Sequence, residues 1–239
     1  MTSAIILAGG VGARVGAGIP KQFIEVLGKP IMIYTLETFE KDPRIDEIVF
    51  VCVAPYMELA EKYCRQYAIS KAKTFVEGGE DFTHSCINGM HALQTKCKPD
   101  DIVVITSADR PFISQEEIDD SIAVCTAHGS GIAARKCPLC MFMVGEDRSH
   151  SNNYQRENLL QTATPWTFQY GLLMDALDRF EVGKLPPCES YPPAIYVAAG
   201  HEAYFSQAKP RNIKITEKAD ISLMEQMLKE RETDDTAAI

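Results

Sequence analysis

The chain reads Ala4-Ile5-Ile6-Leu7-Ala8-Gly9-Gly10-Val11-Gly12-Ala13-Arg14-Val15-Gly16 near its start, a short apolar run followed at once by closely spaced glycines. The apolar run predicts a buried strand. Glycines let backbone N–H groups approach an anion closely, so the strand and loop together predict a site for a polyphosphate. Arg14 and Lys21 add two fixed positive charges beside this loop.

Other glycine-rich motifs fit this loop less well. It is not a P-loop, because no Gly-Lys-Ser/Thr is present. It is a poor dinucleotide fingerprint, because Gly16 comes too late and Pro20 interrupts the helix that should follow. A plain glycine-rich turn is the remaining alternative, and Arg14 with Pro20-Lys21 at this distance argues against it.

Beyond the loop, short apolar runs alternate with helical patterns. Strands are expected over residues 47–54, 73–76 and 101–108, and helices over residues 31–40, 57–68 and 85–93. Ser114 and Glu117 form a capping box that begins a further helix through Cys125. This alternation predicts an α/β fold, a Rossmann-like doubly wound and mostly parallel sheet, with its ligand at the carboxyl ends of the strands.

Two segments depart from the alternation. Residues 138–155 combine turn-forming residues with an apolar Met-Phe-Met-Val run, which predicts a protruding hairpin arm for dimerisation; a floppy surface loop is the alternative. Residues 229–239 are expected to form a frayed tail after a final helix over residues 220–228. A length of 239 residues fits one α/β domain with an excursion better than two full domains, so residues 1–239 are expected to form a single domain.

Composition excludes several classes of protein. With 24 basic and 33 acidic residues the net charge is −9, so the chain lacks the footprint of a nucleic-acid or membrane binder. No run approaches the length of a membrane span. The eight cysteines lie mostly inside apolar runs, as expected of reduced thiols in a cytoplasmic protein. Cys137 and Cys140 form a C-x-x-C, but no second pair or His-x-His partner completes a metal site.

Several motifs along the chain together resemble one enzyme family. They are the opening loop with Pro20-Lys21-Gln22-Phe23, Glu77-Gly78-Gly79 with Ser85-x-x-Asn88-Gly89, Arg110-Pro111-Phe112, Arg156 with Thr164-Pro165, and Asn212-Ile213-Lys214-Ile215-Thr216 with Asp220. Over most of the chain they resemble 2-C-methyl-D-erythritol 4-phosphate cytidylyltransferases and the related ribitol-5-phosphate cytidylyltransferases.

The resemblance implies a fold and an activity. The fold is that of nucleotide-diphospho-sugar transferases. The activity is transfer of CMP from CTP to a small phosphorylated polyol, ribitol-5-phosphate-like or 2-C-methyl-D-erythritol 4-phosphate, with Mg²⁺ and release of pyrophosphate. A cytoplasmic homodimer is expected.

The resemblance also implies residue roles. The catalytic cations would be Arg14, Lys21 and Lys214; a solvated lysine at a strand end is the alternative for Lys214. The nucleotide would be bound by Ala8, Gly9, Gly10, Gly12, Gly79, Ser85 and Ala108. Arg156 and Thr164 would face the acceptor phosphate, across the dimer arm or from the sheet. Asp109 would hold Mg²⁺.

The chain departs from the family pattern at functional positions. Phe82 replaces an arginine near the base, and is expected either to stack on the base or to belong to the core. Ser107 replaces the family's metal-holding aspartate; Asp109 is the nearest carboxylate, and a turn residue salt-bridged beside Arg110 is the alternative. On the acceptor side most family carboxylates are absent, and Trp166 stands in place of glutamine; a core position is the alternative for Trp166. These changes argue against 2-C-methyl-D-erythritol 4-phosphate as the acceptor.

Two other functions remain open. A catalytically inactive nucleotide-binding relative with a partner-interaction role is favoured by Phe82 and Ser107, and opposed by the retained cations. A glycosyltransferase of the related fold would need an Asp-x-Asp motif, and Ser107-Ala108-Asp109 supplies one of its two carboxylates.

Overall fold

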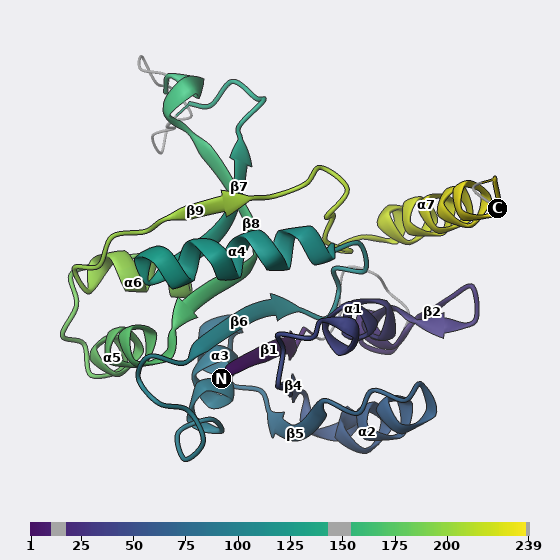
Figure 1. The fold of residues 1–239 in the computed structure, drawn as a ribbon, viewed down its shortest axis with the longest axis horizontal. Coiled ribbons are helices and arrows are strands. Elements are labelled where there is room, and N and C mark those ends of the chain that lie inside the picture. The colour runs from purple at the N-terminus through teal and green to yellow at the C-terminus, as the bar shows by residue number, and fades with distance from the viewer. Residues whose placement is uncertain (11–17, 143–153, 238–239) are drawn as a thin grey trace.

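The computed structural model describes residues 1–10, 18–142 and 154–237. A sheet of seven strands forms its centre, in the order β5-β4-β1-β6-β8-β7-β9 (Figure 1). The strands are β1 (Thr2–Ala8), β4 (Glu47–Cys52), β5 (Ala72–Glu77), β6 (Ile102–Ser107), β7 (Ser130–Lys136), β8 (Leu160–Gln169) and β9 (Phe205–Gln207). The remaining strands, β2 (Glu25–Val26) and β3 (Lys29–Pro30), pair with each other.

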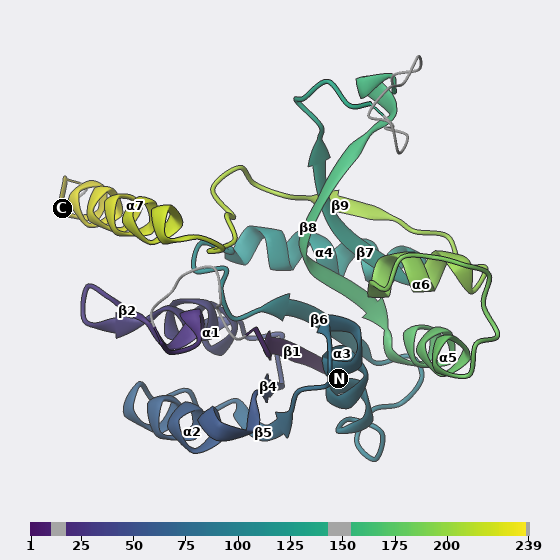
Figure 2. The ribbon, with the colours of Figure 1, turned by 180° about the vertical axis from the view of Figure 1, so that it is seen from behind.

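Helices cover both faces of the sheet (Figures 1 and 2). They are α1 (Ile31–Lys41), α2 (Met57–Gln66), α3 (Phe82–His91), α4 (Gln115–His128), α5 (Tyr170–Glu181), α6 (Pro192–Ala198) and α7 (Lys218–Ala237). Short 3₁₀ turns are η1 (Lys21–Phe23), η2 (Ala54–Tyr56) and η3 (Arg156–Asn158).

The side chains of β1 alternate between two cores. Ala4 and Ile6 face the core built with α1, α2 and α4. Ile5 and Leu7 face the core built with α3, α5 and α6. Because both faces are buried, β1 and β4 read in the sequence as continuous apolar runs. The predicted doubly wound α/β architecture is confirmed.

Within the seven strands described, β8 alone runs against the others. It pairs antiparallel with both β6 and β7, while β1 is parallel to β4 and β6. The register between β7 and β8 shifts at Ile132 and Ala134, opposite Pro165, which has no N–H for the ladder. The sheet is therefore mostly parallel, as predicted, with one reversed strand that the sequence analysis did not anticipate.

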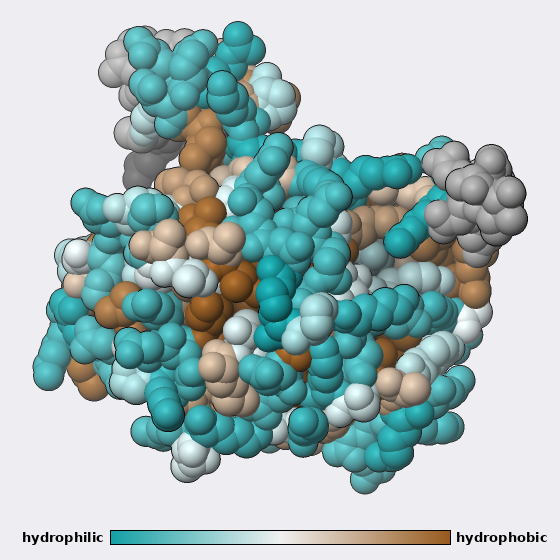
Figure 3. Space-filling view, in the orientation of Figure 1, coloured by the Kyte–Doolittle hydropathy of each residue, from teal (hydrophilic) through white to brown (hydrophobic). Residues whose placement is uncertain are grey.

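The β7–β8 hairpin continues past the body of the protein as an arm (Figure 1). Beyond the two strands, toward the end of the described arm, the Tyr154 N–H donates to the Met141 carbonyl at 3.1 Å. Of the predicted arm, residues 143–153 lie outside the described part of the chain. The described arm exposes the apolar side chains of Leu139, Met141 and Phe142, and Figure 3 shows apolar surface at its foot and on the body below.

The C-terminal segment corrects one expectation. The last helix was predicted to end at Leu228 and to give way to a frayed tail, but α7 continues to Ala237. Glutamate, lysine and arginine are strong helix formers even without apolar packing. Lys229 also pairs with Glu225 one turn earlier at 2.6 Å, which supports the exposed helix.

Among the described helices, none is both long and apolar enough to cross a membrane.

Candidate active site

A cavity of about 320 Å³ lies at the carboxyl ends of the central strands. The loops after β1, β5 and β6 meet there, as expected for a doubly wound sheet. The cavity brings together the predicted residues Ala8, Gly9, Gly10, Lys21, Gly79, Ser85, Ala108, Asp109 and Lys214. It is also lined by Leu7, Gln22, Glu80, Asp81, Phe82 and Ser107.

Lys21 is held in this cavity by its neighbour in the chain. The buried Gln22 side chain donates from Nε2 to the carbonyl of Ala8, at the end of β1. This bond anchors η1 against the strand and places Lys21 beside the glycines. Gly12 and Arg14, the other predicted residues of the loop, lie outside the described residues.

Lys21 and Asp109 form a buried ion pair. Lys21 Nζ lies 2.6 Å from Asp109 Oδ2, with the side chains 10% and 8% exposed. The second carboxylate oxygen, Asp109 Oδ1, is buried and has no hydrogen-bond partner among the described residues. Asp109 therefore forms its salt bridge with Lys21, across the cavity, and not with the adjacent Arg110. Arg110 instead donates to the carbonyl of Asn212.

The orphaned oxygen of Asp109 suits a metal ion. Mg²⁺ takes oxygen ligands and is usually bound through one or two carboxylates, with phosphates and water completing the shell. A buried carboxylate with one oxygen unpartnered, beside a phosphate-type loop, provides that donor. Asp109 is therefore the residue that fits Mg²⁺ here.

The loop between β5 and α3 is built around Ser85. Ser85 Oγ accepts from the Gly79 N–H at 3.0 Å and donates to the Asp81 carbonyl at 2.7 Å. A Cβ on Gly79 would lie 2.4 Å from the Cβ of His84, so no larger residue fits without a backbone shift.

Asp81 caps the start of α3. Its carboxylate accepts from the His84 N–H at 2.8 Å. Burial alone would raise the pKa of Asp81, but the hydrogen bonds from His84 outweigh it and lower the pKa. The His84 ring also contacts this carboxylate, with Nδ1 2.8 Å from Asp81 Oδ1, and this hydrogen bond raises the pKa of His84. Both shifts favour the charged pair, which fixes the first turn of α3 at the cavity.

Lys214 is placed by the segment before α7. The Ile215 N–H donates to the Asp109 carbonyl at 2.9 Å. The buried Asn212 side chain donates to Glu117 Oε1 at 3.0 Å and to the Thr164 carbonyl at 2.7 Å. These bonds fix the backbone on both sides of Lys214, while its side chain remains exposed.

A second cavity, of about 270 Å³, adjoins the first through Lys214, which lines both. Its charged lining residues are all basic: Arg110, Arg135, Lys209 and Lys214; no described lining residue is acidic. Burial is the main cause that lowers the pKa of Arg110, and the charge of Arg135 acts in the same direction, although Asp109 and Glu117 oppose it. This cationic cavity therefore favours an anion.

The structure does not bring the two predicted acceptor residues into either cavity. Thr164 is 4% exposed, and its hydroxyl is 2.6 Å from that of Thr106, between β8 and β6. Its neighbours Thr162 and Ala163 line the cationic cavity instead. Arg156 begins η3 on the arm, where it is exposed.

Gln22 and Asp81 line the cavity although neither was predicted to, and the structure also places Phe82, for which two positions were expected. Gln22 belongs to the quoted Pro-Lys-Gln-Phe motif, but its burial and its bond to Ala8 have no sequence signal. Asp81 does carry a sequence signal, because an aspartate directly before a helix is a typical N-cap. Phe82 stands in the cavity wall and contacts the rings of Trp166 and Tyr191.

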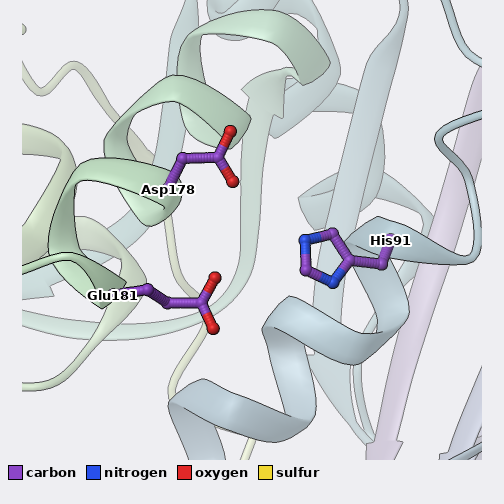
Figure 4. Close-up of side chains that lie close together, drawn as sticks. All are labelled: His91, Asp178 and Glu181. Atoms are coloured by element: carbon purple, nitrogen blue, oxygen red, sulfur yellow. The ribbon is translucent and has the colours of Figure 1, made fainter.

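One further group of ligand-type side chains occurs among the described residues, away from both cavities. His91 on α3 faces Asp178 and Glu181 on α5, with ligand atoms within 4.8 Å of one another (Figure 4). All three are exposed. They lie at the opposite end of α3 from Phe82, so they take no part in the cavity.

Comparisons with known proteins cover nearly the whole chain. The family model described as 2-C-methyl-D-erythritol 4-phosphate cytidylyltransferase matches residues 2–230. A ribitol-5-phosphate cytidylyltransferase of Lacticaseibacillus paracasei is 35% identical over 233 residues, 97% of this chain and 100% of the relative. A 2-C-methyl-D-erythritol 4-phosphate cytidylyltransferase of Alkaliphilus oremlandii is 32% identical over 231 residues, 96% of each chain.

The structural comparison agrees on the fold. The crystal structure of a 4-diphosphocytidyl-2C-methyl-D-erythritol synthase from Anaerococcus prevotii superposes with a TM-score of 0.80. It is 21% identical in sequence and covers 96% of this chain and 98% of its own.

Proposed function

The chain belongs to the 2-C-methyl-D-erythritol 4-phosphate cytidylyltransferase family, and on that basis we propose that it transfers CMP from CTP to ribitol 5-phosphate. The relative from Lacticaseibacillus paracasei, which matches end to end, supports this acceptor. The absent acceptor-side carboxylates argue against 2-C-methyl-D-erythritol 4-phosphate, whereas Trp166 is buried in the core and lines neither cavity. 2-C-Methyl-D-erythritol 4-phosphate is the second candidate, supported by the Alkaliphilus oremlandii relative. An inactive nucleotide-binding relative is not favoured, because the curated relatives are enzymes by name.

The observation that carries the proposal is the position of Lys214 between two cavities. CTP occupies the larger cavity, with its β- and γ-phosphates against the glycine loop and Lys21. The phosphate of the acceptor occupies the cationic cavity. Lys214 then stands beside both reacting phosphates.

The reaction is an in-line displacement at phosphorus. An oxygen of the acceptor phosphate forms a bond to the α-phosphorus of CTP, and the bond from that phosphorus to the bridging oxygen of the β-phosphate breaks. Pyrophosphate leaves with the bonding electron pair. Positioning and charge neutralisation carry such a transfer. Lys214 stabilises the charge that builds on the α-phosphoryl oxygens, and Lys21 stabilises the leaving pyrophosphate.

Asp109 would hold Mg²⁺ through its unpartnered oxygen. When bound, the ion neutralises phosphate charge. The protein's own part is to pair that carboxylate with Lys21 and to exclude bulk water from the pair through burial.

We also propose a homodimer in the cytoplasm. The exposed apolar side chains of the arm, Leu139, Met141, Phe142 and Tyr154, would pack against a second copy. Arg156, on the same arm, would then reach the acceptor phosphate of the partner's site. All eight cysteines are free thiols, which suits a reducing compartment.

The test is Mg²⁺-dependent release of pyrophosphate. The purified protein is supplied with CTP and, in parallel, ribitol 5-phosphate, 2-C-methyl-D-erythritol 4-phosphate or glycerol 3-phosphate, with UTP as the control nucleotide. We expect release with CTP and ribitol 5-phosphate. Pyrophosphate release with the erythritol phosphate alone would show that this compound is the acceptor. No pyrophosphate release with any acceptor would contradict the proposed activity.

A further inference from the structure

Three aromatic rings form a closed cluster at the wall of the nucleotide cavity. The Phe82 ring lies 5.7 Å from Trp166 at an interplanar angle of 72°, and 5.9 Å from Tyr191. Trp166 and Tyr191 lie 6.3 Å apart and nearly perpendicular. Such edge-to-face and tilted contacts are the favoured geometry of aromatic pairs. Each ring therefore limits the movement of the other two.

The rings come from three parts of the chain that other bonds fix. Phe82 is the first residue of α3, directly after its cap Asp81. Trp166 belongs to β8, where it pairs with Ile105 of β6. Tyr191 precedes α6, and the Thr83 hydroxyl donates to the neighbouring Ser190 carbonyl at 2.6 Å. The Phe82 ring is thus held at its backbone and around its edge.

Lys214 lies over this ring. Its Nζ is 5.9 Å from the centroid of Phe82, and both residues line the nucleotide cavity. The face of an aromatic ring carries negative potential and attracts an ammonium group within about 6 Å. An exposed lysine has many rotamers, and ordering them costs conformational entropy. A fixed ring beneath the ammonium restricts that freedom before substrate binds.

We propose that Phe82 is a positioning residue that holds the Lys214 ammonium at the junction of the two cavities, where the reacting phosphates meet. The inference rests on the proposed function, because it assigns Phe82 a role through a lysine that this function places beside the α-phosphate. Trp166 and Tyr191 act indirectly, because they hold the Phe82 ring in place.

The contact itself is tested without substrate. Lysines are dimethylated with carbon-13 formaldehyde, and the Lys214 methyl signal is assigned by its loss in Lys214→Arg. We expect ring-current displacement of this signal in the wild type and its disappearance in Phe82→Leu. Tyr34→Leu is the matched control, since Lys29 lies 4.7 Å above the Tyr34 ring. It should move the Lys29 signal alone. A Lys214 signal unchanged in Phe82→Leu would overturn the inference, whether or not the protein is a cytidylyltransferase.

The role is tested by kinetics. We expect Phe82→Leu to lower kcat about tenfold, or about 1.4 kcal/mol, with KM for CTP within about threefold of the wild type. Phe82→Tyr, which keeps the ring, should restore kcat. In a Lys214→Ala background, Phe82→Leu should lower kcat by less than about twofold, because the two residues act as one unit. Equal losses in both backgrounds would refute the positioning role, while no turnover in the wild type would refute the proposed function instead.

Discussion

At the scale of single residues, the ion pair between Lys21 and Asp109 links stability to metal dependence. Asp109→Asn keeps the size of the side chain and removes its charge. Lys21 then remains buried without its partner, and we expect a loss of about 1–3 kcal/mol in the free energy of unfolding. The Mg²⁺ concentration for half-maximal rate should rise at least about tenfold, because a carboxylate ligand is lost.

Chemical denaturation and initial rates over a range of Mg²⁺ concentrations measure these two effects. Asp119→Asn is the control, because this aspartate is 52% exposed on α4 and pairs with Arg44 away from the cavity. An Asp109→Asn enzyme with wild-type Mg²⁺ dependence would show that the metal is held elsewhere.

Both lysines of the cavity should matter for turnover. Lys21→Ala should also destabilise the fold, because it leaves the buried Asp109 carboxylate without its partner. We expect Lys21→Ala and Lys214→Ala each to lower kcat at least about a hundredfold, as the loss of one oxyanion donor does in other enzymes. Lys214 is exposed, so its removal should leave the fold intact. Lys62→Ala, at an exposed position on α2, controls for the loss of a positive charge. Near-normal rates in either cavity variant would remove that lysine from the mechanism.

At the scale of elements, the start of α7 predicts a pH dependence. One oxygen of Asp220 accepts from the N–H and hydroxyl of Thr216 and from the Glu217 N–H, at 2.7–2.8 Å. Burial would raise the pKa of Asp220, but these bonds outweigh it and hold the pKa below its ordinary value of 3.8. A carboxyl whose pKa is lowered by folding stabilises the fold above pH 3.8, and this contribution is lost as pH falls through the folded pKa.

Asp220→Asn should therefore lower the free energy of unfolding by about 1 kcal/mol at pH 7. The difference from the wild type should vanish once the pH falls below the folded pKa, where both side chains are neutral. Denaturation curves between pH 2 and pH 7 measure it, and Asp100→Asn, an exposed position before β6, serves as control. A difference that is the same at every pH would show that the charge of Asp220 contributes nothing.

The elements also show how far the sequence is informative. β1, β4 and β6 were predictable because strands buried on both faces must be apolar throughout, and α4 because Ser114 and Glu117 form the capping box that the structure contains. β8 was missed, since Pro165 inside it argues against a strand; the register shift opposite accommodates it. The end of α7 was misplaced because a charged sequence gives no apolar period to follow.

At the scale of the whole molecule, the site depends on contacts that no local pattern encodes. The glycines and Lys21 were predictable from one continuous motif. The cationic cavity was not, because Arg110, Arg135 and Lys209 come from separate segments that only the sheet order brings together. Thr164 was assigned to the acceptor from the family motif. Its bond to Thr106 uses its hydroxyl inside the sheet.

The arm makes a prediction about the assembled protein. Arg156 lies on an arm that extends from the body, so in the proposed dimer it completes the partner's site rather than its own. Arg156→Ala and Lys214→Ala subunits should each be nearly inactive alone. When the two are unfolded together and refolded as a mixture, half of the dimers should combine one of each. Each such dimer has one site with both residues intact, so we expect about a quarter of wild-type activity.

The result separates three cases. Recovery of activity would show that Arg156 acts across the dimer. A mixture as inactive as its components would place Arg156 and Lys214 in the same subunit's site, provided that light scattering shows a dimer. Phe142→Asp, which puts a charge on the exposed apolar side of the arm, should abolish both dimerisation and recovery, because a buried unpaired carboxylate opposes association. A Phe142→Asp mixture that still forms dimers and still recovers activity would rule out this side chain of the arm as the link.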